Sequence, residues 1–223
     1  MRLLIVNPNS TQDMTDRIGA EARGYLPEGI ELILRTNLSG PPSIQGAIDG
    51  DMALPGTLSL LLETQFDAAI VGCFDDTGLA EAAASLSKPV IGLGEAAARA
   101  ANEAAGQFAI LTTSELSVPV IAKNMETYGL LTKLNCVRAS QIDVLDFETD
   151  RAAASNNLTQ AAKNLLIEAP DIRTIVLGCA GMGGLAEEMA SALNIDVIDP
   201  IKASVNMAIK RCEARTPSKA SSS

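Results

Sequence analysis

Short runs of aliphatic residues alternate with longer, often Ala-rich stretches along the chain. The runs are apolar at consecutive positions, which is typical of parallel strands covered on both faces. The pattern predicts strands over 2–7, 30–35, 68–72, 89–93, 107–112, 134–138, 173–178 and 195–198. It predicts helices over 11–25, 78–86, 95–105, 116–128, 152–168, 184–193 and 201–214. This alternation indicates an α/β fold, and the Ser-rich end, 216–223, is expected to be a disordered tail.

The chain also repeats itself at a distance of about a hundred residues. The letters GLAE follow Cys73 at 78–81 and follow Cys179 at 184–187, at the same spacing. A second match joins "IVNPNS" near the start to "ILTTSE" in the second half. Matches in the same order indicate two copies of one α/β unit.

We therefore expect two pseudo-symmetric Rossmann-like or flavodoxin-like lobes with parallel sheets and an active-site cleft between them. The predicted boundaries are 1–95 plus 205–223 for the lobe that carries Cys73, and 96–204 for the lobe that carries Cys179. Each cysteine then lies at the carboxyl end of a buried strand, where parallel sheets bind ligands. A helix terminus beside it would lower the pKa of the thiol. Two thiols facing one cleft would suit proton transfer.

The composition of the chain limits its expected compartment, its partners and the side chains available for proton transfer. The four cysteines of the 223 residues form no CxxC pair, and no secretory or membrane-spanning segment is recognisable, so we expect a cytoplasmic protein. The formal net charge is minus 10 with no basic run, which argues against nucleic acid or a membrane and favours a small molecule. The chain has no histidine, so cysteines or carboxylates must carry any proton chemistry.

Five motifs in order carry a resemblance to a known family. They are "NPNST" at 7–11, "GCFDD" at 72–76, "VIGLGEAA" at 90–97, "LGCAGM" at 177–182 and "VIDP" at 197–200. Together they resemble the aspartate/glutamate/hydantoin racemase family, most closely its hydantoin and allantoin racemase branch. The resemblance implies a cofactor-independent racemase without a metal, acting on a cyclic ureide or hydantoin. A homo-oligomer is also expected.

The resemblance assigns roles residue by residue. Cys73 and Cys179 match two thiols on opposite faces of the substrate, one removing a proton and the other returning it. The implied substrate-binding residues are Asn9, Ser10, Pro41, Ile44, Phe74, Asp75, Thr112, Thr113, Ala180 and Gly181. The backbone after each cysteine would hold the polar edge of the substrate. The side chains of Asp75 and Asp76 are interpreted as helix caps. Cys136 and Cys212 lack the glycine context and are expected to be core or surface thiols.

Other functions stay open at this point. Glutamate racemases add an Asp and a His, whereas this chain has Asn9 and the pair Ala180 and Gly181 at the matching positions. A site in which fewer groups assist the thiols suits the C5 hydrogen of a hydantoin, which is more acidic than the corresponding hydrogen of a free amino acid. The alternatives are an isomerase of the maleate isomerase type, an aspartate or glutamate racemase, and a two-lobed protein that binds a small ligand without catalysis.

Overall fold

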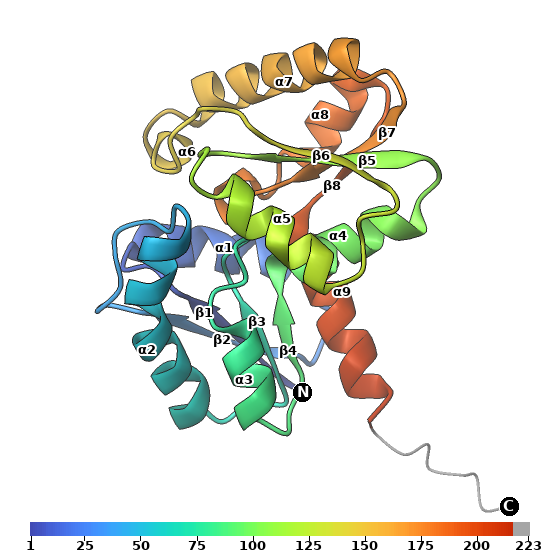
Figure 1. Cartoon of the computed structure of the whole chain (residues 1–223). Helices are drawn as coiled ribbons and strands as arrows, with labels where there is room; N and C mark the ends of the chain where they lie inside the picture. Colours follow the sequence, from blue (N-terminus) through green and yellow to red (C-terminus); the bar gives the residue numbers. More distant parts are fainter. Residues whose placement is uncertain (216–223) are drawn as a thin grey trace, which may run out of the picture.

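Two four-stranded parallel sheets form the two lobes of this computed structural model, which describes residues 1–215 (Figure 1). The N-terminal sheet has the order β2-β1-β3-β4, and the C-terminal sheet has the equivalent order β6-β5-β7-β8. The strands are β1 (Arg2–Asn7), β2 (Glu31–Thr36), β3 (Ala68–Val71), β4 (Val90–Gly92), β5 (Gln107–Thr112), β6 (Leu134–Ala139), β7 (Ile172–Leu177) and β8 (Asp196–Ile198). All eight predicted strands and the duplication are confirmed.

The predicted helices are also present. They are α1 (Gln12–Tyr25), α3 (Leu79–Ser85), α4 (Leu93–Glu103), α5 (Val118–Thr127), α7 (Arg151–Glu168), α8 (Ala186–Leu193) and α9 (Pro200–Glu213). Three further elements were not predicted, namely α2 (Ala47–Glu63), α6 (Asp146–Thr149) and the 3-10 turn η1 (Ala180–Met182). Helix α2 contains Pro55 and glycines, which local propensity disfavours, but Ala53, Thr57 and Leu61 are buried against the lobe. Packing outweighs propensity there.

Helices α4 and α9 link the lobes by crossing between them. Helix α4 follows β4 of the N-terminal sheet and packs on β5 and β7 of the C-terminal sheet. Helix α9 follows β8 and packs on α1 and β3 of the N-terminal lobe, and the two helices also contact each other (Figure 1). The lobe boundaries near residue 95 and residue 205 stay a prediction, and residues 216–223, including the expected tail, lie outside the described residues.

The carboxyl ends of both central strands meet where the lobes face each other. Residues 3–6 of β1 and 108–111 of β5 are fully buried, because helices cover both faces of each sheet. Their neighbours β3 and β7 are equally buried at their carboxyl ends. The loops that leave these strands therefore converge on the interface between the lobes.

Candidate active site

The two predicted cysteines occupy the same place in the two lobes, directly after β3 and β7. Gly72 and Gly178 precede them and donate their N–H groups to the carbonyls of Val6, at 2.8 Å, and Leu111, at 2.9 Å. A Cβ at residue 178 would lie 3.0 Å from the Thr112 Cα, so glycine allows the strand end to stay against β5. Backbone geometry thus fixes where each thiol stands.

Both thiols line one small cavity between the lobes. Its volume is about 20 Å³, enough for one water molecule. The lining residues are Asn9, Met14, Ile44, Gly72, Cys73, Phe74, Asp75, Thr112, Thr113, Ser117, Val144, Gly178, Cys179 and Ala180. Within the described residues, no Lys or Arg lines it. A hydantoin ring is larger than this volume, so the cavity must widen for a substrate to bind between the thiols.

Seven of the ten expected substrate-binding residues line this cavity, and three do not. Ser10 and Pro41 bond to each other through the backbone, from Ser10 N–H to the Pro41 carbonyl at 2.9 Å. Gly181 lies behind Cys179, where an added Cβ would be 3.7 Å from the thiol sulfur. None of these three residues lines the cavity, and substrate contact stays a prediction for all ten.

Five lining residues were not predicted, namely Met14, Gly72, Ser117, Val144 and Gly178. The two glycines stand in the quoted cysteine motifs and could have been found from that position. Ser117 is the residue directly before α5, a position where serine is common in sequences. Met14 and Val144 carry no sequence signal, because only the folding of α1 and of the loop after β6 brings them to the cavity.

Burial dominates the electrostatics of both thiols. It raises the pKa of Cys179 to about 11 and raises the pKa of Cys73 well above its ordinary value, and the charge of Asp75 adds to both increases. Backbone donors oppose this effect. The backbone N–H of Asp75 and the hydroxyl of Thr77, which lies 4.0 Å from the sulfur, lower the pKa of Cys73. The backbone N–H groups of Gly181 and Met182 lower the pKa of Cys179. Two groups of this kind therefore oppose burial at each sulfur.

The expected lowering of the thiol pKa values is wrong for this structure. Helix α3 begins only at Leu79, so its N-terminus does not lie at Cys73. Cys179 is followed by the single turn η1, whose aligned peptides are too few to offset burial. The backbone N–H groups of Asp75 and Gly181 lower the pKa values of the neighbouring sulfurs, and their expected contact with the substrate stays a prediction.

Asp75 is the charged residue that lines the cavity in the described part of the chain. Its carboxylate accepts from the Gly46 N–H and from the Ser117 hydroxyl, both at 3.1 Å. Gly46 precedes α2 of its own lobe and Ser117 precedes α5 of the other lobe. The residue is 8% exposed, and burial raises its pKa to about 6. Asp75 thus joins the two lobes at the cavity wall.

Asp76 is the helix cap that the sequence predicted, but for a different helix than the one that follows it. Its carboxylate accepts from the N–H groups of Gly94 and Glu95, both at 2.8 Å, at the start of α4. The Tyr128 hydroxyl donates to it at 2.7 Å from α5. Burial raises its pKa to about 7. Asp76 therefore anchors the Cys73 loop to the helix that crosses between the lobes.

A guanidinium group holds the Cys179 loop in place. Arg151, at the start of α7, donates to the carbonyls of Gly181, at 3.0 Å, and Gly183. At the end of the loop, the Gly184 N–H donates to the Asp199 carboxylate at 2.7 Å. These contacts fix the loop whose N–H groups reach the Cys179 sulfur.

The segment after β6 covers the cavity from the C-terminal lobe. Phe147 of α6 is fully buried, and Val144 lines the cavity. Glu148 of α6 forms an ion pair with Arg17 of α1, which belongs to the other lobe. This pair joins the covering segment to the N-terminal lobe.

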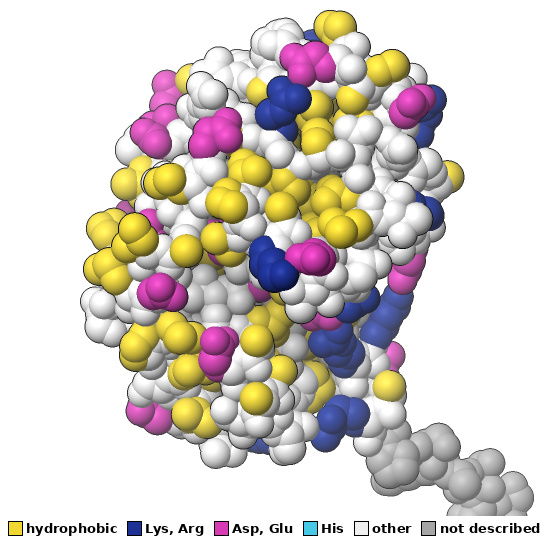
Figure 2. All heavy atoms as spheres, in the orientation of Figure 1, with side chains coloured by type: hydrophobic (Ala, Val, Ile, Leu, Met, Phe, Trp, Pro, Cys, Tyr) yellow, Lys and Arg dark blue, Asp and Glu magenta, His cyan; other side chains and the backbone are white. Residues whose placement is uncertain are grey.

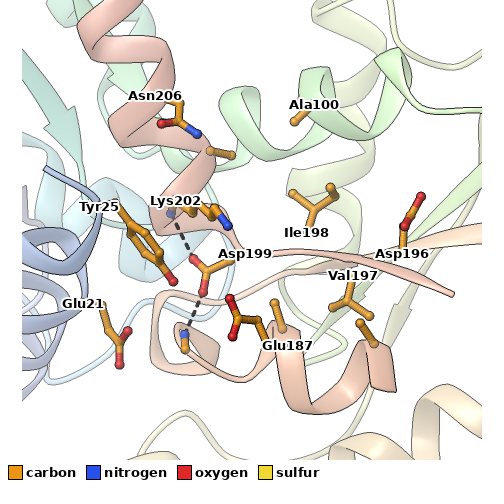
Figure 3. A pocket seen from close by; sticks show the side chains of 14 residues that line it. Glu21, Tyr25, Ala100, Glu187, Asp196, Val197, Ile198, Asp199, Lys202 and Asn206 are labelled. Atoms are coloured by element: carbon orange, nitrogen blue, oxygen red, sulfur yellow. Dashed lines mark hydrogen bonds between the residues drawn. The ribbon is translucent and has the colours of Figure 1, made fainter. Parts of the chain in front are cut away.

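A larger cavity of about 590 Å³ lies on another side of the molecule. Figure 3 shows Asp199 within it, with the labelled side chains of Tyr25, Glu21 and Glu187 around it. Its wall includes Gly184 but neither catalytic candidate thiol. In the part of the chain that is described, no predicted site residue lines this cavity, so it is not the predicted active site.

Acidic side chains are scattered over both lobes on the face drawn in Figure 2. Across residues 1–215, no helix has the length and apolarity to cross a bilayer. Within the same residues, no group of three or more His, Cys, Asp or Glu side chains is arranged to hold a metal ion. None of the four cysteines, which all lie within residues 1–215, forms a disulfide bond.

The sequence and the fold agree with known racemases. A family model described as Asp/Glu/Hydantoin racemase matches residues 3–208, so the chain belongs to this family. It is an enzyme, a racemase, and the alternative of a binding protein without catalysis is not supported.

Particular relatives lie in the hydantoin and allantoin branch. A hydantoin racemase of Rhizobium meliloti is 34% identical over 212 residues, covering 93% of this chain and 87% of the relative. The crystal structure of allantoin racemase from Pseudomonas fluorescens matches with a TM-score of 0.91 and 30% identity, over 96% of this chain and 92% of that chain. Allantoin racemase from Klebsiella pneumoniae matches with a TM-score of 0.88 and 31% identity, over 94% and 86%. The predicted family, branch and fold are confirmed.

Proposed function

We propose that the chain racemises the C5 stereocentre of a hydantoin-type cyclic amide, such as a 5-substituted hydantoin or allantoin, without a cofactor. The observation that carries the proposal is that one thiol from each of two equivalent lobes lines the same small cavity. The names of the relatives, hydantoin racemase and allantoin racemase, support the substrate class.

In the proposed reaction, Cys73 and Cys179 act on opposite faces of the ring. One thiolate takes the proton from C5, and the electron pair of the C–H bond moves into the adjacent carbonyl to give an enolate. The other thiol then gives its proton to the opposite face of C5. The stereocentre is inverted, and the two sulfurs have exchanged protonation states.

Cys179 is the sulfur that ionises first in this proposal. Two backbone N–H groups lower the pKa of Cys179, whereas one backbone N–H group and the Thr77 hydroxyl, at 4.0 Å, lower the pKa of Cys73. Burial and the nearby charge of Asp75 both raise the pKa of the Cys73 thiol. The reactive form of the free enzyme is then a Cys179 thiolate opposite a Cys73 thiol.

An uncharged cyclic amide fits the cavity better than a free amino acid or maleate. Along the described chain, Asp75 is the charged lining residue, and no cation lines the wall to pair with a carboxylate. The C5 hydrogen of a hydantoin lies between a ring carbonyl and a ring nitrogen, and no carboxylate repels the developing enolate. Two thiols with few assisting groups around them can therefore remove the C5 hydrogen.

A substrate panel tests this function. Separate L- and D-hydantoins, allantoin, aspartate and glutamate would be followed by decay of circular dichroism, and maleate by its absorbance. We expect decay for a hydantoin or for allantoin and none for the other three. Turnover of only maleate, or of only aspartate or glutamate, would assign one of the alternative functions instead.

We also propose that the enzyme is cytoplasmic and homo-oligomeric. None of its four cysteines, all within the described residues, forms a disulfide bond, which suits a reducing compartment. Leu38 and Ile48, each 78% exposed, and Leu116, 65% exposed, are large apolar side chains that a second copy could cover. Light scattering of the purified protein measures the molar mass directly, and a monomer at micromolar concentration would contradict the oligomer.

A further inference from the structure

The wall of the cavity carries a negative charge without a cation beside it in the described residues. In the described residues, Asp75 is the charged lining residue, and the other walls are apolar, hydroxyl, amide or thiol groups. The Gly46 N–H and the Ser117 hydroxyl hold the carboxylate in place, and neither carries a formal charge. Ionisation of Asp75 therefore leaves one uncompensated negative charge on the wall.

The position of this charge relative to the thiols matters. Its field acts on Cys73 and also on Cys179, which come from opposite lobes. A group that influences both sulfurs lies close to whatever occupies the space between them. Among buried groups, the interaction between two charges is stronger than in water. A substrate between the thiols would therefore experience the Asp75 charge.

We propose that Asp75 is a specificity-determining residue that selects uncharged substrates and rejects substrates carrying an anionic group near the reacting carbon. This inference rests on the proposed function and deepens it. The chain would accept hydantoins with neutral side chains and discriminate against those whose 5-substituent ends in a carboxylate. The discrimination acts by like-charge repulsion, since no lining cation in residues 1–215 offsets it.

A matched pair of probes tests the proposal. The probes are 5-carbamoylmethylhydantoin, which is neutral, and 5-carboxymethylhydantoin, which is anionic at pH 8 and nearly the same size. Racemisation of both would be measured as kcat/KM by circular dichroism. We expect the wild type to prefer the neutral probe by about tenfold or more. Equal values for the two probes would overturn the proposal without any variant.

The Asp75→Asn variant isolates the source of the preference. Its side chain keeps an oxygen that can accept from the Gly46 N–H, and it removes the charge. We expect the preference for the neutral probe to shrink about tenfold or more, with the anionic probe gaining relative to the neutral one. Asp51→Asn removes an equal charge from an exposed position on α2 and should leave the preference unchanged.

Other outcomes separate the competing roles. Equal losses on both probes in Asp75→Asn would assign Asp75 to proton transfer or to structure, and would overturn charge selection. If Asp75→Asn does not fold, Asp75→Ser repeats the measurement with a smaller neutral side chain. If the wild type turns over no hydantoin and no allantoin, the proposed function fails. Charge selection is then tested by calorimetric binding of the same two probes, where equal affinities would overturn it.

Discussion

The two cysteine loops are built on the same plan and stabilised in opposite ways. Each follows a Gly-Cys strand end, and each closes with a glycine at positive φ, Gly78 at 78° and Gly184 at 77°. The Cys73 loop carries its own carboxylates, Asp75 and Asp76, which reach out to neighbouring helix starts. The Cys179 loop contains no acidic residue within 179–184, and Arg151 and Asp199, which lie outside the loop, hold it.

Two thiols with the same backbone geometry can therefore differ in how readily they ionise. A carboxylate beside Cys73 opposes thiolate formation, while two N–H donors at Cys179 favour it. Duplication can therefore supply two acid-base groups, and divergence of the loops can set which one is ionised.

Replacing either catalytic candidate thiol should have the largest effect. Cys73→Ser and Cys179→Ser should each lower racemisation about a thousandfold or more in both directions, since inversion uses both sulfurs. In heavy water, each variant should retain some exchange of the C5 proton for one enantiomer, and the two variants should prefer opposite enantiomers. NMR of both enantiomers measures this, with Cys136→Ser as the unchanged control. Exchange of the same enantiomer by both variants would contradict opposed faces.

Replacing Arg151, whose guanidinium group holds the Cys179 loop, should have the next largest effect. Arg151→Ala should lower kcat about tenfold to a hundredfold, because the N–H groups of Gly181 and Met182 would lose their alignment on the sulfur. Arg151→Lys should recover little, since it lacks the fork that reaches two carbonyls. The loss should be greater for deuterium exchange through Cys179 than through Cys73. Arg138→Ala, which removes an exposed ion pair, is the control. An equal loss of kcat in the Arg151 and Arg138 variants would contradict the role of Arg151 in holding the loop.

The order of thiol ionisation can be measured by alkylation. Modification by iodoacetamide should have an apparent pKa above that of a free thiol, about 8.5, at both sites, and it should be lower for Cys179 than for Cys73. The rate should rise about tenfold per pH unit below each pKa. Mass spectrometry of partly modified protein at several pH values gives both profiles. An earlier titration of Cys73 would reverse the proposed assignment.

The smallest expected effect concerns stability. The folded pKa of Asp76, about 7, lies above the ordinary 3.8, so its protonated form favours folding below about pH 4 and this contribution is lost as the pH rises through 7. Asp76→Asn should lower the free energy of unfolding by about 1–3 kcal/mol at pH 5, because one of three donors loses its acceptor.

The difference should become smaller at pH 8, since asparagine does not titrate. Thermal melting of both proteins at pH 5 and pH 8 checks the prediction, with Asp51→Asn as an exposed control. A difference that grows with pH would contradict the burial-raised pKa of Asp76.

Local and repeated features of the sequence were sufficient for much of the molecule. Consecutive apolar residues predicted the eight strands, because buried parallel strands need apolar side chains on both faces. The repeated glycine-cysteine context predicted where Cys73 and Cys179 lie. Helix α2 escaped prediction because Pro55 lies inside it and only contacts with the lobe make it helical.

The sequence by itself determined the two α/β units and the pair of thiols at their strand ends, since hydrophobic periodicity and the motifs are local properties. Only the tertiary structure decided that Met14 and Val144 complete the cavity and that Asp75 lies at the N-termini of helices from both lobes. It also decided that both thiol pKa values rise. Burial and long-range charge depend on which distant segments surround a group, and no local pattern encodes that environment.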